Sequence, residues 1–216
     1  MAKQTVGVLG SGAVGQVLAA GFRKHGYAVT IGSRTPGKLG QWLEGAGAGV
    51  DSGSFADAAA ADILVLAVGG AVATEALDLA GHDRLAGKVI LDATNPIAPG
   101  PPVNGILEYF TGPNESLMER LQAHVPAARF VKAFSCVGSA FMVNPAFQGG
   151  RATMFICGND AAAKAQAVTI LDQFGWDAED VGVVTGARAI EPLCRLWCAP
   201  GLLRNDWSHA YRVVRP

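Results

Sequence analysis

An α/β protein with a doubly wound parallel sheet is the fold that the sequence predicts. Short apolar runs that suit buried strands alternate with segments of helical spacing from Thr5 to Phe134. This alternation favours parallel strands joined by right-handed helical crossovers. A glycine-rich turn also follows the first strand directly, and the pattern changes after Gly149. We therefore expect two domains, a nucleotide-binding sheet domain over residues 1–149 and a small C-terminal α+β appendage over residues 150–216.

The expected elements follow one another closely along the chain. Apolar runs predict strands at 5–9, 28–31, 63–68, 88–93, 130–134 and 152–157, with a last short strand at 210–214. Apolar residues at helical spacing, with capping and breaking residues at the ends, predict helices at 14–25, 36–45, 55–61, 71–80, 114–125 and 161–174. The segment 185–203 is expected to form one helix or a broken pair of helices.

Composition excludes several classes of protein. Apolar residues make up 50% of the chain and charged residues 16%, which is typical of a globular protein. The net charge is −1 and no basic block is present, so a nucleic-acid partner is not expected. The longest apolar stretch, residues 63–73, is well short of the roughly 20 residues that a membrane span needs, and the chain start carries no hydrophobic signal region. We expect a cytoplasmic protein with no membrane partner.

The cysteines do not suggest a disulfide framework or a metal site. Cys136 and Cys157 lie in apolar runs and are expected to be buried small hydrophobic residues. Cys194 and Cys198 are one helical turn apart, but no second Cys or His pair stands beside them. No metal ligands are therefore assigned.

The glycine-rich turn predicts a Rossmann dinucleotide site. Gly10, Gly12 and Gly15 form the pattern G-x-G-x-x-G between the first expected strand and the first expected helix. In such a turn the first glycine permits the sharp bend, the second lets a pyrophosphate approach the backbone, and the third allows close packing of helix on strand. The amide groups at the start of the helix would then face the phosphates.

The end of the second strand favours NADP over NAD. A site for NAD carries an acidic residue there, which accepts hydrogen bonds from the ribose 2′-hydroxyl. This chain has Ser33 and Arg34 instead, with Lys38 one helical turn further on. A hydroxyl donor, a guanidinium fork and a second cation suit the 2′-phosphate of NADP.

Four motifs together resemble a known family. The segments GSGAVGQVLAAGFRKHGYAVTIGSRTPGK, DATNP, VKAFSCV and GARAIEPL occur in the order found in the NADPH:coenzyme F420 oxidoreductases, to which the cytosolic domain of the six-transmembrane metalloreductases is related. The resemblance covers nearly the whole chain. It implies a Rossmann domain with a small C-terminal domain, NADP(H) as cofactor, and hydride transfer to or from the deazaflavin coenzyme F420.

The resemblance also implies where the cofactor is held. Ser11, Ala13 and Val14 would line the pyrophosphate together with the three glycines. The 2′-phosphate would be held by Ser33, Arg34 and Lys38. Ala67 and Val68 would lie along the nicotinamide ribose, and Asn95, Pro96 and Ala133 would border the nicotinamide.

The acceptor side of the site is less well marked. Hydride transfer between two flat rings needs little acid–base machinery, and no catalytic dyad is evident. Asn95 is a candidate for orienting the rings. Lys132 ends a strand that points at the cofactor, and His209 is the only histidine in the segment expected to cover the acceptor. The family commonly has Asn where this chain has Ser135, which leaves the hydride partner open.

Other functions remain open on the sequence alone. The acceptor could be an ordinary flavin or a ferric chelate, as in the related metalloreductases, or a small carbonyl or imine compound. A non-catalytic NADP sensor is a further alternative. Apolar residues near the C-terminus, among them Trp197, Leu203 and Trp207, lead us to expect a homodimer formed through that segment.

Overall fold

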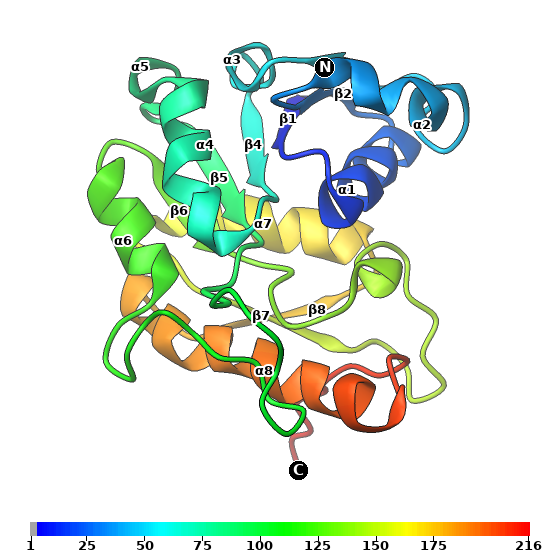
Figure 1. Ribbon diagram of the computed structural model, residues 1–216, viewed down its shortest axis with the longest axis vertical. Coiled ribbons are helices and arrows are strands. Elements are labelled where there is room, and N and C mark those ends of the chain that lie inside the picture. Colours follow the sequence, from blue (N-terminus) through cyan, green and yellow to red (C-terminus); the bar gives the residue numbers. More distant parts are fainter. Residues whose placement is uncertain (1–3) are drawn as a thin grey trace.

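The structure, a computed structural model, describes residues 4–216 and contains the predicted parallel sheet. Six strands lie in the order β3-β2-β1-β4-β5-β6, and all neighbours are parallel (Figure 1). This is the strand order of a Rossmann sheet, and the chain changes direction across the sheet between β1 and β4. The strands are β1 Thr5–Leu9, β2 Ala28–Gly32, β3 Asp51–Gly53, β4 Ile63–Leu66, β5 Val89–Asp92 and β6 Arg129–Lys132.

Helices cover both faces of the sheet. Buried side chains of α1 and α7 form one apolar cluster with the sheet, and those of α3, α4 and α6 form a second cluster on the opposite face. The α-helices are α1 Ala13–Lys24, α2 Gly40–Glu44, α3 Phe55–Ala58, α4 Ala73–Ala80, α5 His82–Leu85, α6 Leu117–His124, α7 Ala161–Gln173 and α8 Ala187–Arg204. The 3₁₀ helices within residues 4–216 are η1 Pro36–Leu39, η2 Gly70–Val72, η3 Ser139–Phe141 and η4 Val184–Gly186.

A small second sheet lies below the first in Figure 1, next to α8. It consists of β7 Thr153–Ile156 and β8 Asp177–Asp180, which are parallel. One backbone bridge, in which the Lys132 amide donates to the Cys157 carbonyl at 3.0 Å, connects the end of β6 to this sheet. Buried residues of β7 and α7 belong to the same apolar cluster as β1 and β2. The division at residue 149 stays a prediction.

The expected strand at 210–214 is wrong. The segment is extended beside β7 but makes only one backbone bond to it, from the Thr153 amide to the Tyr211 carbonyl. The next amide, that of Val213, donates to the Thr153 hydroxyl instead of to a backbone carbonyl. A side chain therefore takes the place of the second ladder bond, and no strand forms.

Several elements differ in extent from the expectation. The helix expected at 36–45 is divided into η1 and α2, in a stretch that contains Gly37 and Gly40. The helix expected from residue 114 begins only at Leu117, because the Ser116 hydroxyl caps it by accepting the Glu119 amide. Ser54 caps α3 through a reciprocal pair of bonds with Asp57. The segment from Ala187 is one continuous helix despite Pro192 and Pro200.

No helix within residues 4–216 has both the length and the apolar character required to cross a bilayer. All four cysteines are free thiols, and Cys136 and Cys157 are buried as predicted.

Candidate functional site

The glycine turn follows β1 and has the three separate roles expected of it. Gly10 has φ of +126°, and a Cβ there would lie 2.3 Å from the Ala67 carbonyl oxygen. A Cβ on Gly15 would lie 1.9 Å from the Gly10 carbonyl oxygen, so α1 packs directly on the turn. A Cβ on Gly12 would meet no protein atom within 4 Å. The surface over Gly12 is therefore open, and the first amides of α1, which no side chain caps, border it.

Ser33 lies at the end of β2 and connects the glycine turn to the following loop. Its side chain is buried, and its hydroxyl accepts bonds from the Ser11 hydroxyl at 2.9 Å and from the Thr35 amide at 3.1 Å. With both acceptor positions used, the Ser33 proton remains available to a ligand. Arg34 is exposed, and its guanidinium lies 3.6 Å from the Glu75 carboxylate. This exposed contact is weak and can be exchanged for a stronger anion.

A groove of about 300 Å³ brings the predicted 2′-phosphate residues together. Two cations and no carboxylate line it, so the charge of its lining suits an anion. Its lining residues are Ser11, Gly12, Ser33, Arg34, Thr35, Lys38, Phe55, Ala67, Val68, Gly69 and Val72. Thr35, Phe55, Gly69 and Val72 were not expected from the sequence, because single residues in the loops and short helices that follow the strands carry no recognisable pattern.

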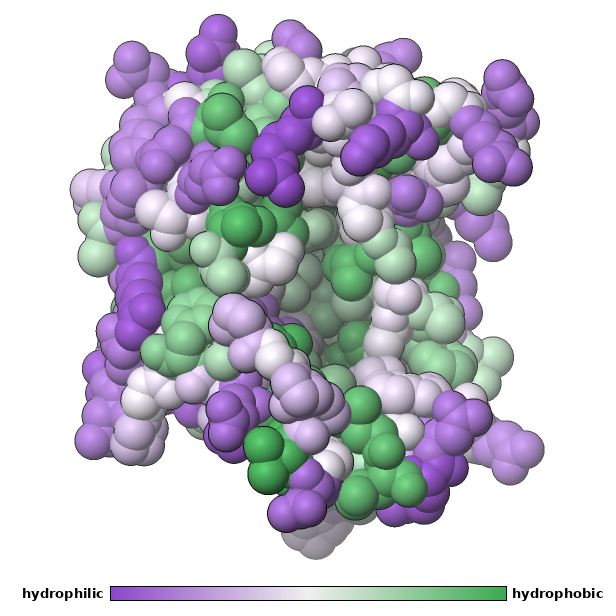
Figure 2. Space-filling view, in the orientation of Figure 1, coloured by the Kyte–Doolittle hydropathy of each residue, from purple (hydrophilic) through white to green (hydrophobic). Residues whose placement is uncertain are grey.

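The groove continues past the glycine turn toward the middle of the sheet. A second section of about 290 Å³ shares four lining residues with the first and reaches Ala93, directly after β5. Its lining is Gly12, Ala13, Val14, Ala67, Val68, Gly69 and Ala93. The carboxyl ends of the strands face the centre of the view in Figure 1, where Figure 2 shows a hollow bordered by apolar and weakly polar residues. The two sections form one channel with a cationic end and an apolar end.

Asn95 lines neither section of the channel, but it follows the lining residue Ala93 by two positions and carries a buried acceptor without a partner. Its amide nitrogen donates to the Ser135 carbonyl at 2.8 Å. Its Oδ1 atom is buried without a hydrogen-bond partner, and so is the Ser135 hydroxyl. A buried acceptor without a partner is costly, so it indicates a ligand or water that donates to it. Pro96 is buried beside it.

Ala133 and Lys132 lie beneath the channel surface. Ala133 is fully buried, and its amide donates to the Asp92 carbonyl. Lys132 is also fully buried, so it does not reach a ligand in the channel. The expected place of Ala133 beside the nicotinamide stays a prediction.

Lys132 is the centre of a buried charge cluster. Its ammonium lies 2.7 Å from Asp92 Oδ2 and 2.9 Å from Glu191 Oε1, and it donates to the Thr94 carbonyl at 2.9 Å. Burial alone would lower the pKa of Lys132, but the two carboxylates outweigh this effect and hold the pKa above its usual value. Asp92 Oδ1 accepts from both the amide and the hydroxyl of Thr94. The cluster therefore fixes the backbone immediately before Asn95.

Glu191 extends this cluster to two helices. It is buried in α8, and its carboxylate accepts the amides of Leu117 and Met118, at the start of α6, at 2.9 and 3.0 Å. Sequence reasoning missed the role of Glu191. The available signal was a single carboxylate in the otherwise apolar stretch AIEPL.

His209 lies away from the channel, against the C-terminal half of α8. Its ring stacks on Trp197 with centroids 5.2 Å apart, and the Trp197 indole donates to the His209 carbonyl at 2.8 Å. Neither residue lines either section of the channel. Trp197 is buried and contacts Trp207, so it serves as core here.

The loop after Pro96 and helix α8 contact each other directly. A Cβ on Gly105 would lie 2.4 Å from the Leu203 side chain, and the Tyr109 hydroxyl donates to the Glu191 carbonyl at 2.7 Å. The C-terminal arginines also contact other residues of the chain. The pairs are Arg188 with Glu119, Arg195 with the Tyr109 ring, Arg204 with Asp206, Arg212 with the Gly149 carbonyl and Arg215 with Glu179. Loop and helix therefore form one wall.

A sequence profile and a solved structure that match this chain carry the same family description. The sequence profile described as "NADP oxidoreductase coenzyme F420-dependent" matches residues 5–96. A crystal structure of a proposed F420-dependent NADP reductase from Arthrobacter sp. FB24 is 34% identical, with a TM-score of 0.91, and the match covers 99% of this chain and 100% of that one.

Two further matches extend beyond this chain. The metalloreductase STEAP3 of Rattus norvegicus is 29% identical over 219 residues, which cover 97% of this chain and 42% of the relative. The chain thus spans less than half the length of that relative. An imine reductase from Aspergillus terreus, solved with NADPH4 and dibenz[c,e]azepine, is 21% identical with a TM-score of 0.66, over 91% of this chain and 61% of that one. At this identity the likeness concerns the fold alone.

Proposed function

The chain belongs to the family of coenzyme F420-dependent NADP oxidoreductases, and from this premise we propose that it transfers a hydride between NADP(H) and coenzyme F420. The observation that carries the proposal is the channel, which has an anion-binding end at Ser33, Arg34 and Lys38 and an apolar end at Ala93. NADP has a matching order of groups, with the anionic 2′-phosphate at one end and the flat nicotinamide ring at the other.

The residues present fit NADP(H) at each part of the molecule. The open surface over Gly12 and the uncapped start of α1 suit the pyrophosphate. Ser33 and the two cations suit the 2′-phosphate, and Ala67 with Val68 supplies an apolar wall for the nicotinamide ribose. Asn95 Oδ1, which is buried without a partner, suits the carboxamide N–H₂ of the nicotinamide.

The protein's part in the reaction is positioning. When both were bound, NADPH would supply the hydride from its C4 to C5 of the deazaflavin, and solvent would supply one proton. Asn95 would orient the nicotinamide, and the cluster around Lys132 would hold Asn95 in place through Thr94. No group in the channel needs to move a proton at the reacting carbons, since the cofactors supply that chemistry.

A second candidate function is reduction of an ordinary flavin or a ferric chelate. The observation that favours it is the similarity to a metalloreductase over nearly the whole chain, together with Ser135 where the family commonly has Asn. The small carbonyl or imine alternative has weaker support, because the imine reductase likeness concerns the fold alone and leaves more than a third of that enzyme unmatched.

Isotope transfer distinguishes these functions. NADPH carrying deuterium at C4 is incubated with the protein and F420, and the product is analysed by mass spectrometry and NMR. We expect the label at C5 of reduced F420 without loss to solvent. No reduction of F420, with rapid reduction of free flavin or ferric citrate, would replace the proposal by the second candidate. NADPH binding with no turnover of any acceptor would leave the sensor alternative.

We also propose that the protein is a homodimer through its C-terminal segment. Apolar side chains of α8 and of the loop that contacts it are exposed, and Figure 2 shows such residues gathered at the lower edge of this face. They are Val103, Ile106, Leu196, Leu202, Leu203 and Trp207. Sedimentation equilibrium at micromolar concentration should give twice the chain mass. The double variant Leu196→Glu/Leu203→Glu should give the monomer, and a wild-type monomer would contradict the proposal.

A further inference from the structure

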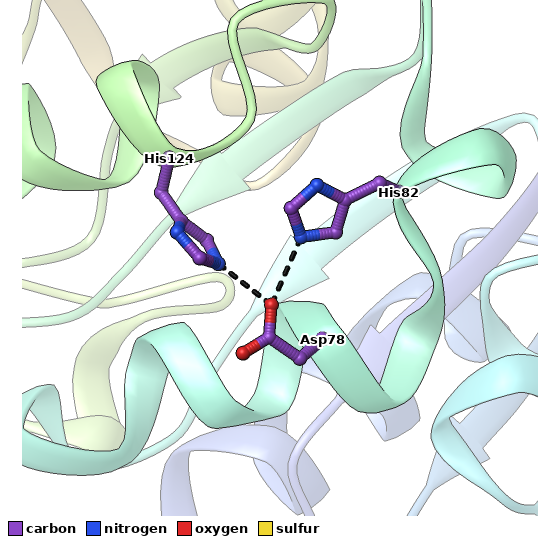
Figure 3. A group of neighbouring side chains, drawn as sticks. All are labelled: Asp78, His82 and His124. Carbon is purple, nitrogen blue, oxygen red and sulfur yellow. Dashed lines mark hydrogen bonds and ion pairs between the residues drawn. The ribbon is translucent and has the colours of Figure 1, made fainter.

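Three side chains from three helices meet on the surface at the far end of α4 from the channel. Asp78 Oδ1 lies 2.9 Å from His82 Nε2 and 2.6 Å from His124 Nε2 (Figure 3). Asp78 is near the end of α4, His82 begins α5, and His124 ends α6. We propose that these three residues bind a divalent transition-metal ion of the zinc type. This proposal does not depend on the redox function.

The arrangement supplies three ligand atoms that converge on one point. The carboxylate oxygen and the two imidazole nitrogens all lie within 4.8 Å of one another. In a tetrahedral zinc site with bonds of about 2.0–2.2 Å, neighbouring ligand atoms are roughly 3.3 Å apart. Small rotations of the three side chains, which are all partly exposed, would admit the ion. The solvent side would leave a fourth position to water.

The backbone that carries the ligands is held in place by the core. Leu77 and Leu121, one residue and three residues away from ligands, are fully buried in the same apolar cluster, so α4 and α6 are fixed against each other. Gly81, with φ of +89°, separates α4 from α5 and brings His82 back over Asp78. The two imidazole rings are nearly perpendicular, with centroids 4.9 Å apart, so both Nε2 atoms can point to one ion without a ring clash.

The donor set selects the class of metal. Two imidazoles and one carboxylate suit Zn²⁺, Ni²⁺, Co²⁺ and Cu²⁺. Ca²⁺ and Mg²⁺ require mostly oxygen ligands and do not fit. Val72, directly before α4, lines the channel, whereas Asp78 lies near the other end of the helix. A bound ion would therefore join α4, α5 and α6 as a clamp and would not contact the cofactor.

No metal site was expected from the sequence, because the third ligand is distant along the chain. Asp78 and His82 are one helical turn apart, but His124 follows Asp78 by 46 residues. The pair alone matches no metal-binding pattern.

Direct binding of Zn²⁺ to the 216-residue chain without an affinity tag tests the proposal. Calorimetric titration with zinc chloride should show one equivalent bound, and the metal should raise the midpoint of thermal unfolding. Co²⁺ in its place should give the visible absorption of a four-coordinate site. His82→Asn and His124→Asn should each weaken Zn²⁺ binding at least about tenfold. Asp83→Asn, which removes an exposed carboxylate beside His82 but no ligand atom, is the matched control and should bind as the wild type does.

Two results would overturn the proposal. No saturable binding of Zn²⁺ or Co²⁺ would mean that the three residues form ion pairs only. Unchanged stoichiometry and affinity in both histidine variants would mean that any bound ion lies elsewhere. Circular dichroism of each variant without metal shows that it folds, so that a loss of binding reports on the ligands.

Discussion

Gly15 lies against the carbonyl of Gly10 so closely that a Cβ on Gly15 would stand 1.9 Å from that oxygen. Movement of a side chain cannot relieve this contact, because the Gly10 oxygen and the Gly15 atom that would carry the new Cβ are both backbone atoms. Gly15→Ala should therefore destabilise the fold by about 1–3 kcal/mol, the usual cost of overpacking, and calorimetry or urea unfolding would measure this change.

Gly12→Ala should behave in the opposite way. No protein atom lies within 4 Å of the new methyl group, so stability should change by less than about 1 kcal/mol. The methyl group would occupy the surface proposed for the pyrophosphate, and NADPH affinity should fall at least about tenfold. A stable Gly12→Ala protein that binds NADPH normally would place the cofactor elsewhere.

Arg34→Ala should weaken NADPH binding selectively. A charge-assisted hydrogen bond contributes about 1.5–3 kcal/mol, which corresponds to roughly a 10- to 150-fold loss of affinity. NADH affinity should hardly change. Glu75→Gln, which removes the carboxylate 3.6 Å from Arg34, is the companion variant and should bind NADPH at least as tightly as the wild type. Fluorescence titration with both cofactors measures these affinities, and equal affinity of the wild type for NADH and NADPH would contradict the assignment.

Lys132→Met should strongly destabilise the protein. The change leaves Asp92 and Glu191 buried without their cation, and the loss of one partner of a buried ion pair costs about 3–5 kcal/mol. Arg34→Ala removes an exposed cation and serves as the control for stability. Adding Asp92→Asn and Glu191→Gln to Lys132→Met should restore part of the loss. An unchanged unfolding midpoint for Lys132→Met would exclude a structural role for the cluster.

The ion pair between Glu119 of α6 and Arg188 of α8 should make the stability of the protein depend on pH. Hydrogen bonds from Arg188 hold the pKa of Glu119 below its ordinary value of 4.5. The stabilisation by ionised Glu119 is therefore complete above that ordinary value and is lost as the pH falls through the lower pKa of the folded state. Glu119→Gln should be less stable than the wild type at pH 7, and the difference should shrink toward zero in acid. Urea unfolding at pH 7, 5 and 3 tests this, with the exposed Glu44→Gln as control.

The main sheet with its glycine turn was predictable from the sequence because the residues that indicate it are close together along the chain. The glycine turn, the apolar strands and the absence of an acid after β2 all lie within short stretches of sequence. By contrast, β3 and β8 have the sequences DSG and DAED, which show no apolar alternation, and they form because a neighbouring strand provides their hydrogen-bond partners.

In the candidate site, too, residues close together in the sequence were predictable and contacts between distant segments were not. Ser33, Arg34 and Lys38 were predicted to act together, and they line one groove. The pairing of Lys132 with Glu191 depends on how α8 packs on the sheet. No local sequence pattern predicts that packing. The meeting of His82 and His124 likewise depends on the packing of α4 against α6.

The position of Glu191 in the last helix has a consequence for synthesis of the chain on the ribosome. Asp92 and Lys132 are synthesised before Glu191, so a sheet that formed at that stage would have only one of the two carboxylates that contact the Lys132 ammonium. The first amides of α6 meanwhile lack the carboxylate that later accepts them. A message truncated before the codon for Glu191 would thus yield a chain that contains every strand of the main sheet but lacks the carboxylate that accepts from Lys132 and from the first amides of α6. Such a product is expected to be less stable than the 216-residue chain, because three buried donors lose this acceptor.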